Sequence, residues 1–136
     1  MTKTYSHQKY NLLVEDTVNN LKKLSELKGG EYAGDSDRLA NFRRNGAALG
    51  LPMETIWAVY AAKHWDAVMQ YIVDLRTGTN RERLESISGR LDDLIVYAVL
   101  MKAMVDEREG DRIKVIETAK EDWGQLTAKI GKTVYE

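Results

Sequence analysis

The chain has 136 residues and a formal net charge of −1, with 20 lysines and arginines against 21 aspartates and glutamates. That length suits one domain over residues 1–136, and the balanced charge disfavours a nucleic-acid-binding protein, which usually carries a basic excess. The absence of cysteine excludes disulfides, cysteine-ligated metal sites and a thiol nucleophile. With two histidines, any metal site must be built mainly from carboxylates, which suit Mg²⁺ or Mn²⁺.

The hydropathy of the chain indicates a protein of the aqueous phase. The first residues lack the apolar segment of a signal peptide, and no apolar run approaches the ~20 residues of a membrane span. We therefore expect a cytoplasmic protein that binds neither membrane nor nucleic acid.

Apolar residues recur at helical spacing, which predicts an all-α fold: a bundle of four main helices plus short helices. The first helix is expected from about Ser6 to Lys28, with Gly29-Gly30 ending it in a left-handed cap. A short helix is expected to start near Ser36 or Asp37 and to end before Gly50.

The second half of the chain predicts two long helices and a shorter one. Pro52 suits the first turn of a helix that runs to about Leu75 and is closed by Thr77-Gly78. Thr79 and Glu82 fit a capping box, which predicts a helix from Thr79 to about Arg108. A fifth helix is expected over about 111–122, and residues 124–136 are expected to form a C-terminal arm.

Residues 94–101 are apolar in eight consecutive positions. At ~100° per residue such a run covers the whole circumference of a helix, which predicts burial on all sides. In a chain this short we expect part of that burial to come from a second subunit, and hence a homo-oligomer.

Three acids precede this run. Asp92 and Asp93 adjoin it directly, and Glu85 lies two turns earlier on nearly the same stripe. A buried carboxylate needs a partner, which is either a divalent cation or a basic side chain such as Arg90. The alternative is a solvated helix turn with a local arginine–aspartate pair.

The segment 31–38 combines acids, a glycine and an arginine just before a helix N-terminus. The free N–H groups of a helix N-terminus attract phosphate, so this loop is a candidate phosphate-binding element. The alternative is a polar loop in which Asp37 caps the helix.

Four motifs follow one another along the chain: Glu31-Tyr32-Ala33; Asp37 to Asn41-Phe42; Lys63-His64; and Glu85-Ser86-Ile87 followed by Asp93 to Tyr97. Their order and spacing, over about residues 10–105, resemble the MazG-like superfamily of all-α nucleoside triphosphate pyrophosphohydrolases, in particular its phage branch, of which one type cleaves dGTP. If a phage encodes the chain, the expected compartment is the host cytoplasm.

The resemblance implies a homodimer or homotetramer that cleaves a nucleoside triphosphate, with dGTP as one candidate, to the monophosphate and pyrophosphate. It implies Mg²⁺ or Mn²⁺ as cofactor. Glu31, Glu85 and Asp93 would be catalytic metal ligands. Gly89 stands where the family often has an acid, and Asp92 is the candidate that replaces it as a fourth ligand.

The resemblance also implies a substrate-binding set. Lys63 and Arg38 would contact phosphates, and Asn41 and Phe42 would shape the nucleotide pocket. Arg43 and Arg44 are weaker candidates, because we expect them to face solvent. His64 and Tyr97 complete the set, although a buried structural histidine and a packing tyrosine are the alternatives for these two positions.

Two functions remain open from the sequence. The first is metal-dependent hydrolysis of a (deoxy)nucleoside triphosphate in phage nucleotide metabolism. The second is a non-catalytic helical interaction or adaptor protein, because an apolar helix that binds another helix fits both.

Overall fold

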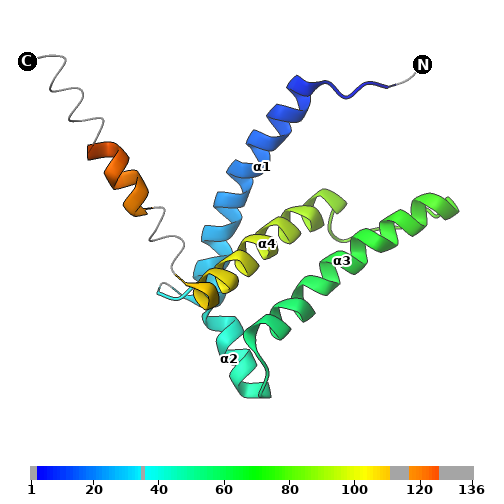
Figure 1. The fold of residues 1–136 in the computed structure, drawn as a ribbon. Helices are drawn as coiled ribbons and strands as arrows, with labels where there is room; N and C mark the ends of the chain where they lie inside the picture. The colour runs from blue at the N-terminus through cyan, green and yellow to red at the C-terminus, as the bar shows by residue number, and fades with distance from the viewer. Residues whose placement is uncertain (1–2, 35, 111–116, 126–136) are drawn as a thin grey trace, which may run out of the picture. The chain divides into compact units, whose positions relative to one another are not determined.

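The computed structural model describes residues 3–34, 36–110 and 117–125. The all-α prediction is confirmed, because the described residues form helices and no strand. The elements in chain order are α1 (His7–Lys28), the π-helical turn η1 (Gly29–Ala33), α2 (Ala40–Leu49), α3 (Met53–Thr77) and α4 (Ile87–Glu109). Figure 1 labels the helices α1 to α4.

Helix α1 begins and ends where the sequence predicts, but its end differs in conformation. The Ser6 hydroxyl accepts a hydrogen bond from the Lys9 N–H at 3.1 Å and caps the first turn. The left-handed cap at Gly29 is wrong: this residue has φ −59° and ψ −50°, and the chain continues into η1. The positive φ occurs five residues later, at Gly34.

Helix α2 starts at Ala40, later than predicted, because Asp37 organises a turn before it. One Asp37 carboxylate oxygen accepts the Leu39 N–H at 3.0 Å, and the other binds Arg43 Nε at 2.9 Å. The predicted end holds, since Gly50 has φ 67°, in the left-handed region.

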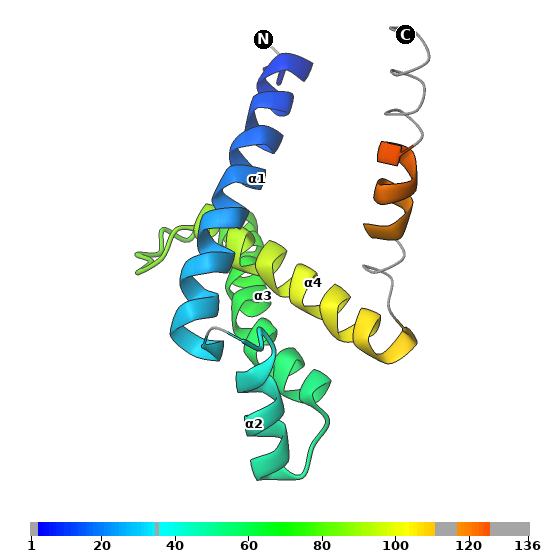
Figure 2. The ribbon, with the colours of Figure 1, turned by 90° about the vertical axis from the view of Figure 1, so that its left-hand side faces the viewer.

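Helices α2 and α3 are joined by a short turn that both ribbon views show (Figures 1 and 2). Gly46 makes this turn possible: a Cβ there would lie 2.6 Å from the Leu51 carbonyl oxygen. Pro52 precedes the first residue of α3, and Gly78, with φ 70°, ends that helix as predicted.

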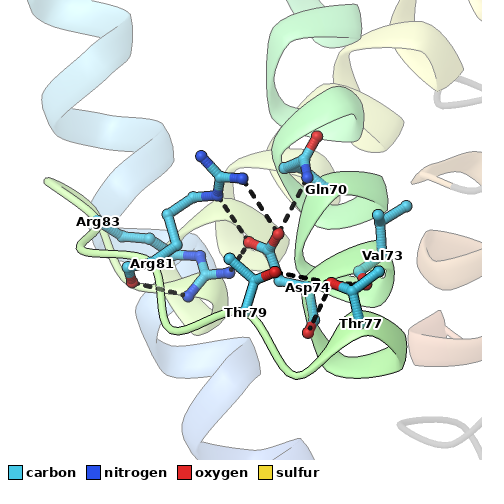
Figure 3. A network of polar contacts seen from close by, with 7 residues as sticks. All are labelled: Gln70, Val73, Asp74, Thr77, Thr79, Arg81 and Arg83. Atoms are coloured by element: carbon cyan, nitrogen blue, oxygen red, sulfur yellow. Dashed lines mark hydrogen bonds and ion pairs between the residues drawn. The ribbon is translucent and has the colours of Figure 1, made fainter.

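The predicted start of α4 at Thr79 is wrong by eight residues. Residues 79–86 form an irregular loop that Asp74 holds at the end of α3, as Figure 3 shows. Arg81 Nε and Arg83 Nη2 reach the Asp74 carboxylate at 2.7 and 2.8 Å. The helix starts instead after Ser86, whose hydroxyl accepts the Gly89 N–H at 2.9 Å in the manner of an N-cap.

Helix α4 runs back along α3, antiparallel to it. Trp57, early in α3, donates its indole N–H to the Tyr97 carbonyl at 2.7 Å, whereas His64, further along α3, meets Arg90 near the start of α4. Within the described chain the run 94–101 is buried on one face of α4, and the burial expected from a second subunit stays a prediction. Val96 and Leu100 are buried, but Ala98 and Val99 are exposed, because one face of α4 lies against α3.

The chain divides into two compact units, Met1–Met101 and Lys102–Glu136. Every predicted site residue lies in the first unit. In the second, residues 117–125 are helical, so the described part of the predicted helix 111–122 is confirmed, but the helix continues past the predicted end to residue 125; residues 111–116 lie outside the described residues. So does most of the expected arm at 124–136.

Two surface properties of the described helices bear on partners. None of them is long and apolar enough to cross a membrane. Helix α1 buries none of its 22 residues within the described chain, although apolar side chains recur along it. The exposed ones are Tyr10, Leu12, Leu13, Val14, Val18 and Leu27.

Candidate metal and anion site

Three side chains converge where α3 and α4 pack together. His64, Glu85 and Asp93 each offer one ligand atom, and these atoms lie within 4.8 Å of one another. His64 comes from α3, Asp93 from α4, and Glu85 from the loop that precedes α4. His64 and Asp93 are buried, whereas Glu85 reaches the group from an exposed position.

Burial keeps the His64 imidazole neutral. Its pKa is lowered chiefly by burial and further by the charges of Lys63, Arg90 and Lys28, against the opposing effect of Asp93. Arg90 Nη1 lies 3.2 Å from His64 Nδ1, and because arginine is only a donor, Nδ1 is the acceptor. A neutral imidazole with a lone pair on the side of the acids is the form that binds metals.

Two cations hold the same three side chains. Lys28, the last residue of α1, forms an ion pair with Asp93 Oδ1. Arg90 Nε lies 3.4 Å from Glu85 Oε2, in addition to its contact with His64. The sequence suggested Arg90 as a partner for one of the three acids Glu85, Asp92 and Asp93, and Glu85 is the one that it contacts.

A cavity of about 470 Å³ opens beside this group. That volume lies within the range of small-molecule sites, roughly 300–1,000 Å³. The lining residues are of three kinds: basic, Lys28, Arg38, Arg44 and Lys63; aromatic, Tyr32, Phe42, Tyr60 and Tyr97; and others, Asn41, Asn45, His64, Glu85, Asp93, Val96 and Leu100.

The cations of this cavity are suited to an anion. Within the described part of the chain, Arg38, Arg44 and Lys63 form no ion pair with an acid. Arg38 lies over Gly29. A Cβ at position 29 would lie 2.9 Å from Arg38 Nε, so the absence of a side chain there leaves room for the guanidinium. Burial lowers the pKa of Arg38, which remains far above neutrality as for arginines generally.

Tyr97 joins the aromatic wall to the charged group. Its ring packs edge-on against Phe42 at a centroid distance of 6.5 Å and against Trp57 at 6.3 Å, and it lies 5.5 Å from the His64 ring. Burial, and then the negative charge of Asp93, raises the pKa of the Tyr97 phenol, which keeps it protonated and able to donate a hydrogen bond.

Asn41 is a half-buried residue of this wall. Its Oδ1 atom is buried and receives no hydrogen bond from the described residues. Asn45, one helical turn on, donates to the Tyr60 hydroxyl at 2.9 Å. The amide oxygen of a residue in such a cavity can accept a hydrogen bond from a bound molecule. Because a buried acceptor without a hydrogen bond costs free energy, a ligand that supplies a donor there would be favoured.

The structure brings together most, but not all, of the residues predicted from sequence. It places eight of them around the cavity: Arg38, Asn41, Phe42, Lys63, His64, Glu85, Asp93 and Tyr97. Glu31 and Asp92 lie outside both the cavity lining and the His64–Glu85–Asp93 group. Glu31 is exposed on η1, and Asp92 is turned about 100° around α4 from Asp93.

Sequence reasoning missed Lys28, Asn45 and Tyr60. It ranked Arg44 as a weaker candidate, and this residue is exposed as expected but also lines the cavity. Lys28 carries no local signal, because a lysine in the last turn of a helix is ordinary. Asn45 and Arg44 follow Asn41 by one turn on the same helix, so helical spacing from the predicted Asn41 would have pointed to them.

The donor set fits a divalent metal. One imidazole nitrogen with two carboxylates suits Mn²⁺, and carboxylates with additional water suit Mg²⁺.

Comparisons of the chain with protein-family models, with curated proteins and with solved structures found no match.

Proposed function

We propose that this protein is a divalent-metal-dependent hydrolase that cleaves a nucleoside triphosphate to the monophosphate and pyrophosphate. One observation carries the proposal: a single cavity joins a candidate metal-ligand group of three residues to Arg38, Arg44 and Lys63, cations that pair with no acid among the described residues, and to an aromatic wall. A triphosphate needs the metal ligands and the cations, and a base and sugar need the aromatic wall.

His64, Glu85 and Asp93 would hold the metal, in place of the set of Glu31, Glu85, Asp92 and Asp93 that the resemblance implies. A bound Mg²⁺ or Mn²⁺ would neutralise phosphate charge and promote ionisation of the attacking water. Arg38 and Lys63 line the same cavity, where they would stabilise the charge that develops on the leaving pyrophosphate.

The other wall would bind the nucleoside. Phe42 and Tyr97 offer apolar ring surface, and the Asn41 amide would hydrogen-bond the base. Among the bases, guanine is the first to test, since its N1–H and amino group would supply donors to the unpaired Asn41 oxygen, and the resemblance also favours dGTP.

The test is a product assay. Purified protein is incubated with each dNTP and NTP, with Mg²⁺, Mn²⁺ or EDTA, and the products are separated by ion exchange. The proposal expects metal-dependent release of monophosphate and pyrophosphate in equal amounts. Absence of turnover with every nucleotide would contradict it.

Two adjacent aspartates provide a matched pair of variants. Asp93→Asn removes a carboxylate of the group, and we expect a loss of kcat on the order of 100-fold or more, as when a metal-centre carboxylate is removed. Asp92→Asn changes the same charge one residue away, and we expect activity within about threefold of the wild type. Equal loss in both variants would favour the ligand set expected from the sequence.

Self-association accompanies this proposal. Helix α1 carries exposed Leu13, Val14 and Val18, and α4 exposes Val99, side chains that a second copy of the chain would cover. The same observation favours a second candidate function, a non-catalytic helical interaction protein. The product assay separates the two, because an interaction protein would self-associate but release no pyrophosphate.

A further inference from the structure

All three candidate metal ligands are engaged by side-chain cations. Lys28 pairs with Asp93 Oδ1, and Arg90 contacts both His64 Nδ1, at 3.2 Å, and Glu85 Oε2, at 3.4 Å. Two acids are thus balanced by two basic residues around one neutral imidazole. A divalent cation added to this arrangement would meet two positive charges at contact distance, so at least one of them must leave.

Lys28 makes one contact with this group, and Arg90 makes two. The Lys28 ammonium sits at the end of a flexible four-carbon chain, so its rotation alone frees Asp93, whereas the planar Arg90 guanidinium contacts His64 and Glu85 together and must also shift from His64 Nδ1 when a cation binds there. Arg90 also lies on α4 itself, three residues before Asp93, while Lys28 comes from the junction of α1 with η1.

The cavity offers Lys28 a second partner. It lines the 470 Å³ cavity together with Arg38 and Lys63, the residues proposed to contact phosphates. A lysine released from Asp93 would remain within this cavity and would face an anion there. Lys28 therefore contacts one candidate metal ligand and also lines the cavity that holds the proposed phosphate contacts.

We propose that Lys28 alternates between two partners: it pairs with Asp93 until a divalent cation takes that carboxylate, and it then binds a phosphate oxygen of the substrate. This inference rests on the proposed function. Lys28 would oppose metal binding on its own and favour triphosphate binding, so that metal and substrate enter the site together. Nothing in the sequence around position 28 indicates such a role.

The decisive measurement is Mn²⁺ binding without nucleotide, monitored through the electron paramagnetic resonance signal of free Mn²⁺. Lys28→Met should tighten Mn²⁺ binding by about tenfold, within the range of coupling between linked sites. Lys63→Met is the matched control, since it removes the same charge from the same cavity without a contact to Asp93. It should change Mn²⁺ binding by less than about threefold, the effect of charge alone.

The second measurement is the KM of the preferred triphosphate at saturating Mn²⁺. Both variants should raise KM several-fold, but only Lys28→Met should combine this with tighter metal binding. Lys28→Gln, which has a shorter side chain and keeps a hydrogen-bond donor, serves as a second variant, and far-UV circular dichroism verifies that each is folded.

Mn²⁺ binding that is equal in Lys28→Met and Lys63→Met, or weaker in Lys28→Met than in the wild type, would overturn this role of Lys28 and leave the proposed function standing. Absence of Mn²⁺ binding in both the wild type and Lys28→Met would overturn the metal site itself. The two failures are therefore distinguishable.

Discussion

Gly29 shows how one missing side chain shapes the cavity. Its Cβ position is taken by Arg38, whose Nε would be 2.9 Å from an added methyl group. The backbone of Gly29 is helical, so alanine fits its φ and ψ without strain. Any effect of a substitution at this position should therefore fall on Arg38 rather than on the helix.

Gly29→Ala should raise the KM of the triphosphate several-fold by displacing Arg38. Stability should stay the same or rise by about 0.5–1 kcal/mol, because alanine favours a helix over glycine. Gly30→Ala is the control, since a Cβ there meets nothing within 4 Å. Steady-state kinetics and urea unfolding of both variants test this, and an unchanged KM in Gly29→Ala would count against a phosphate-binding Arg38.

Asp74 is the residue that holds the loop after α3. It is 3% exposed, and its carboxylate accepts hydrogen bonds from Gln70, Arg81 and Arg83 (Figure 3). The hydrogen bonds from Arg81 and then Gln70 lower its pKa below the ordinary 3.8. A carboxyl group with a lowered pKa in the folded state stabilises the fold above its unfolded pKa, and this stabilisation is lost as the pH falls through the folded pKa.

Asp74→Asn should therefore lower Tm by several degrees at pH 6–7, and the difference from the wild type should shrink below pH 4. Asp66→Asn, an exposed position on the same helix, should show a small difference at every pH. Thermal unfolding followed by circular dichroism between pH 3 and pH 7 measures both. A difference that is constant with pH would mean that the Asp74 charge does not hold the loop.

At the scale of elements, the start of α4 depends on competition between two caps. Thr79 and Glu82 match a capping box, yet Asp74 draws Arg81 and Arg83 into its network and keeps this stretch irregular. Ser86 then caps the helix. The delayed start is what brings Glu85 to Asp93 from a loop rather than from the helix.

Ser86→Ala should cost about 1 kcal/mol of unfolding free energy, the usual effect of losing an N-cap hydroxyl. Glu82→Ala should cost less than about 0.5 kcal/mol, since Glu82 is exposed in the loop. Urea unfolding of the two variants decides between the caps. A larger loss for Glu82→Ala would show that the helix begins at Thr79 in solution.

At the scale of the whole molecule, the exposed apolar side chains of α1 predict self-association. Tyr10, Val14 and Val18 recur every four residues and so lie along one face of the helix. Exposure of an apolar face to water is unfavourable in free energy, and a second copy of the chain can bury this face.

Light scattering coupled to size exclusion should give the wild type a mass of at least twice the 15.5 kDa of one chain. Replacing Val14 and Val18 together by glutamate should reduce that mass to a single chain, because buried charges without partners oppose association. Replacing Lys22 and Lys23 by glutamate makes a larger charge change on the same helix and should leave the assembly intact. A wild type of 15.5 kDa would contradict the prediction.

The sequence by itself determined the helices and most of their ends. Ser6, Gly50 and Gly78 act through backbone groups within a few residues, so their patterns predict the start of α1 and the ends of α2 and α3. It also indicated eight residues of the cavity through the spacing of four motifs and their resemblance to a known superfamily.

Only the tertiary structure decided which acids meet. Glu85 and Asp93 join His64, whereas Asp92 does not, because rotation around α4 separates neighbours in sequence and the packing of α3 selects one of them. The Lys28–Asp93 pair joins residues 65 positions apart. Local propensity carries no information about such a contact, since its free energy arises only when two helices already lie together.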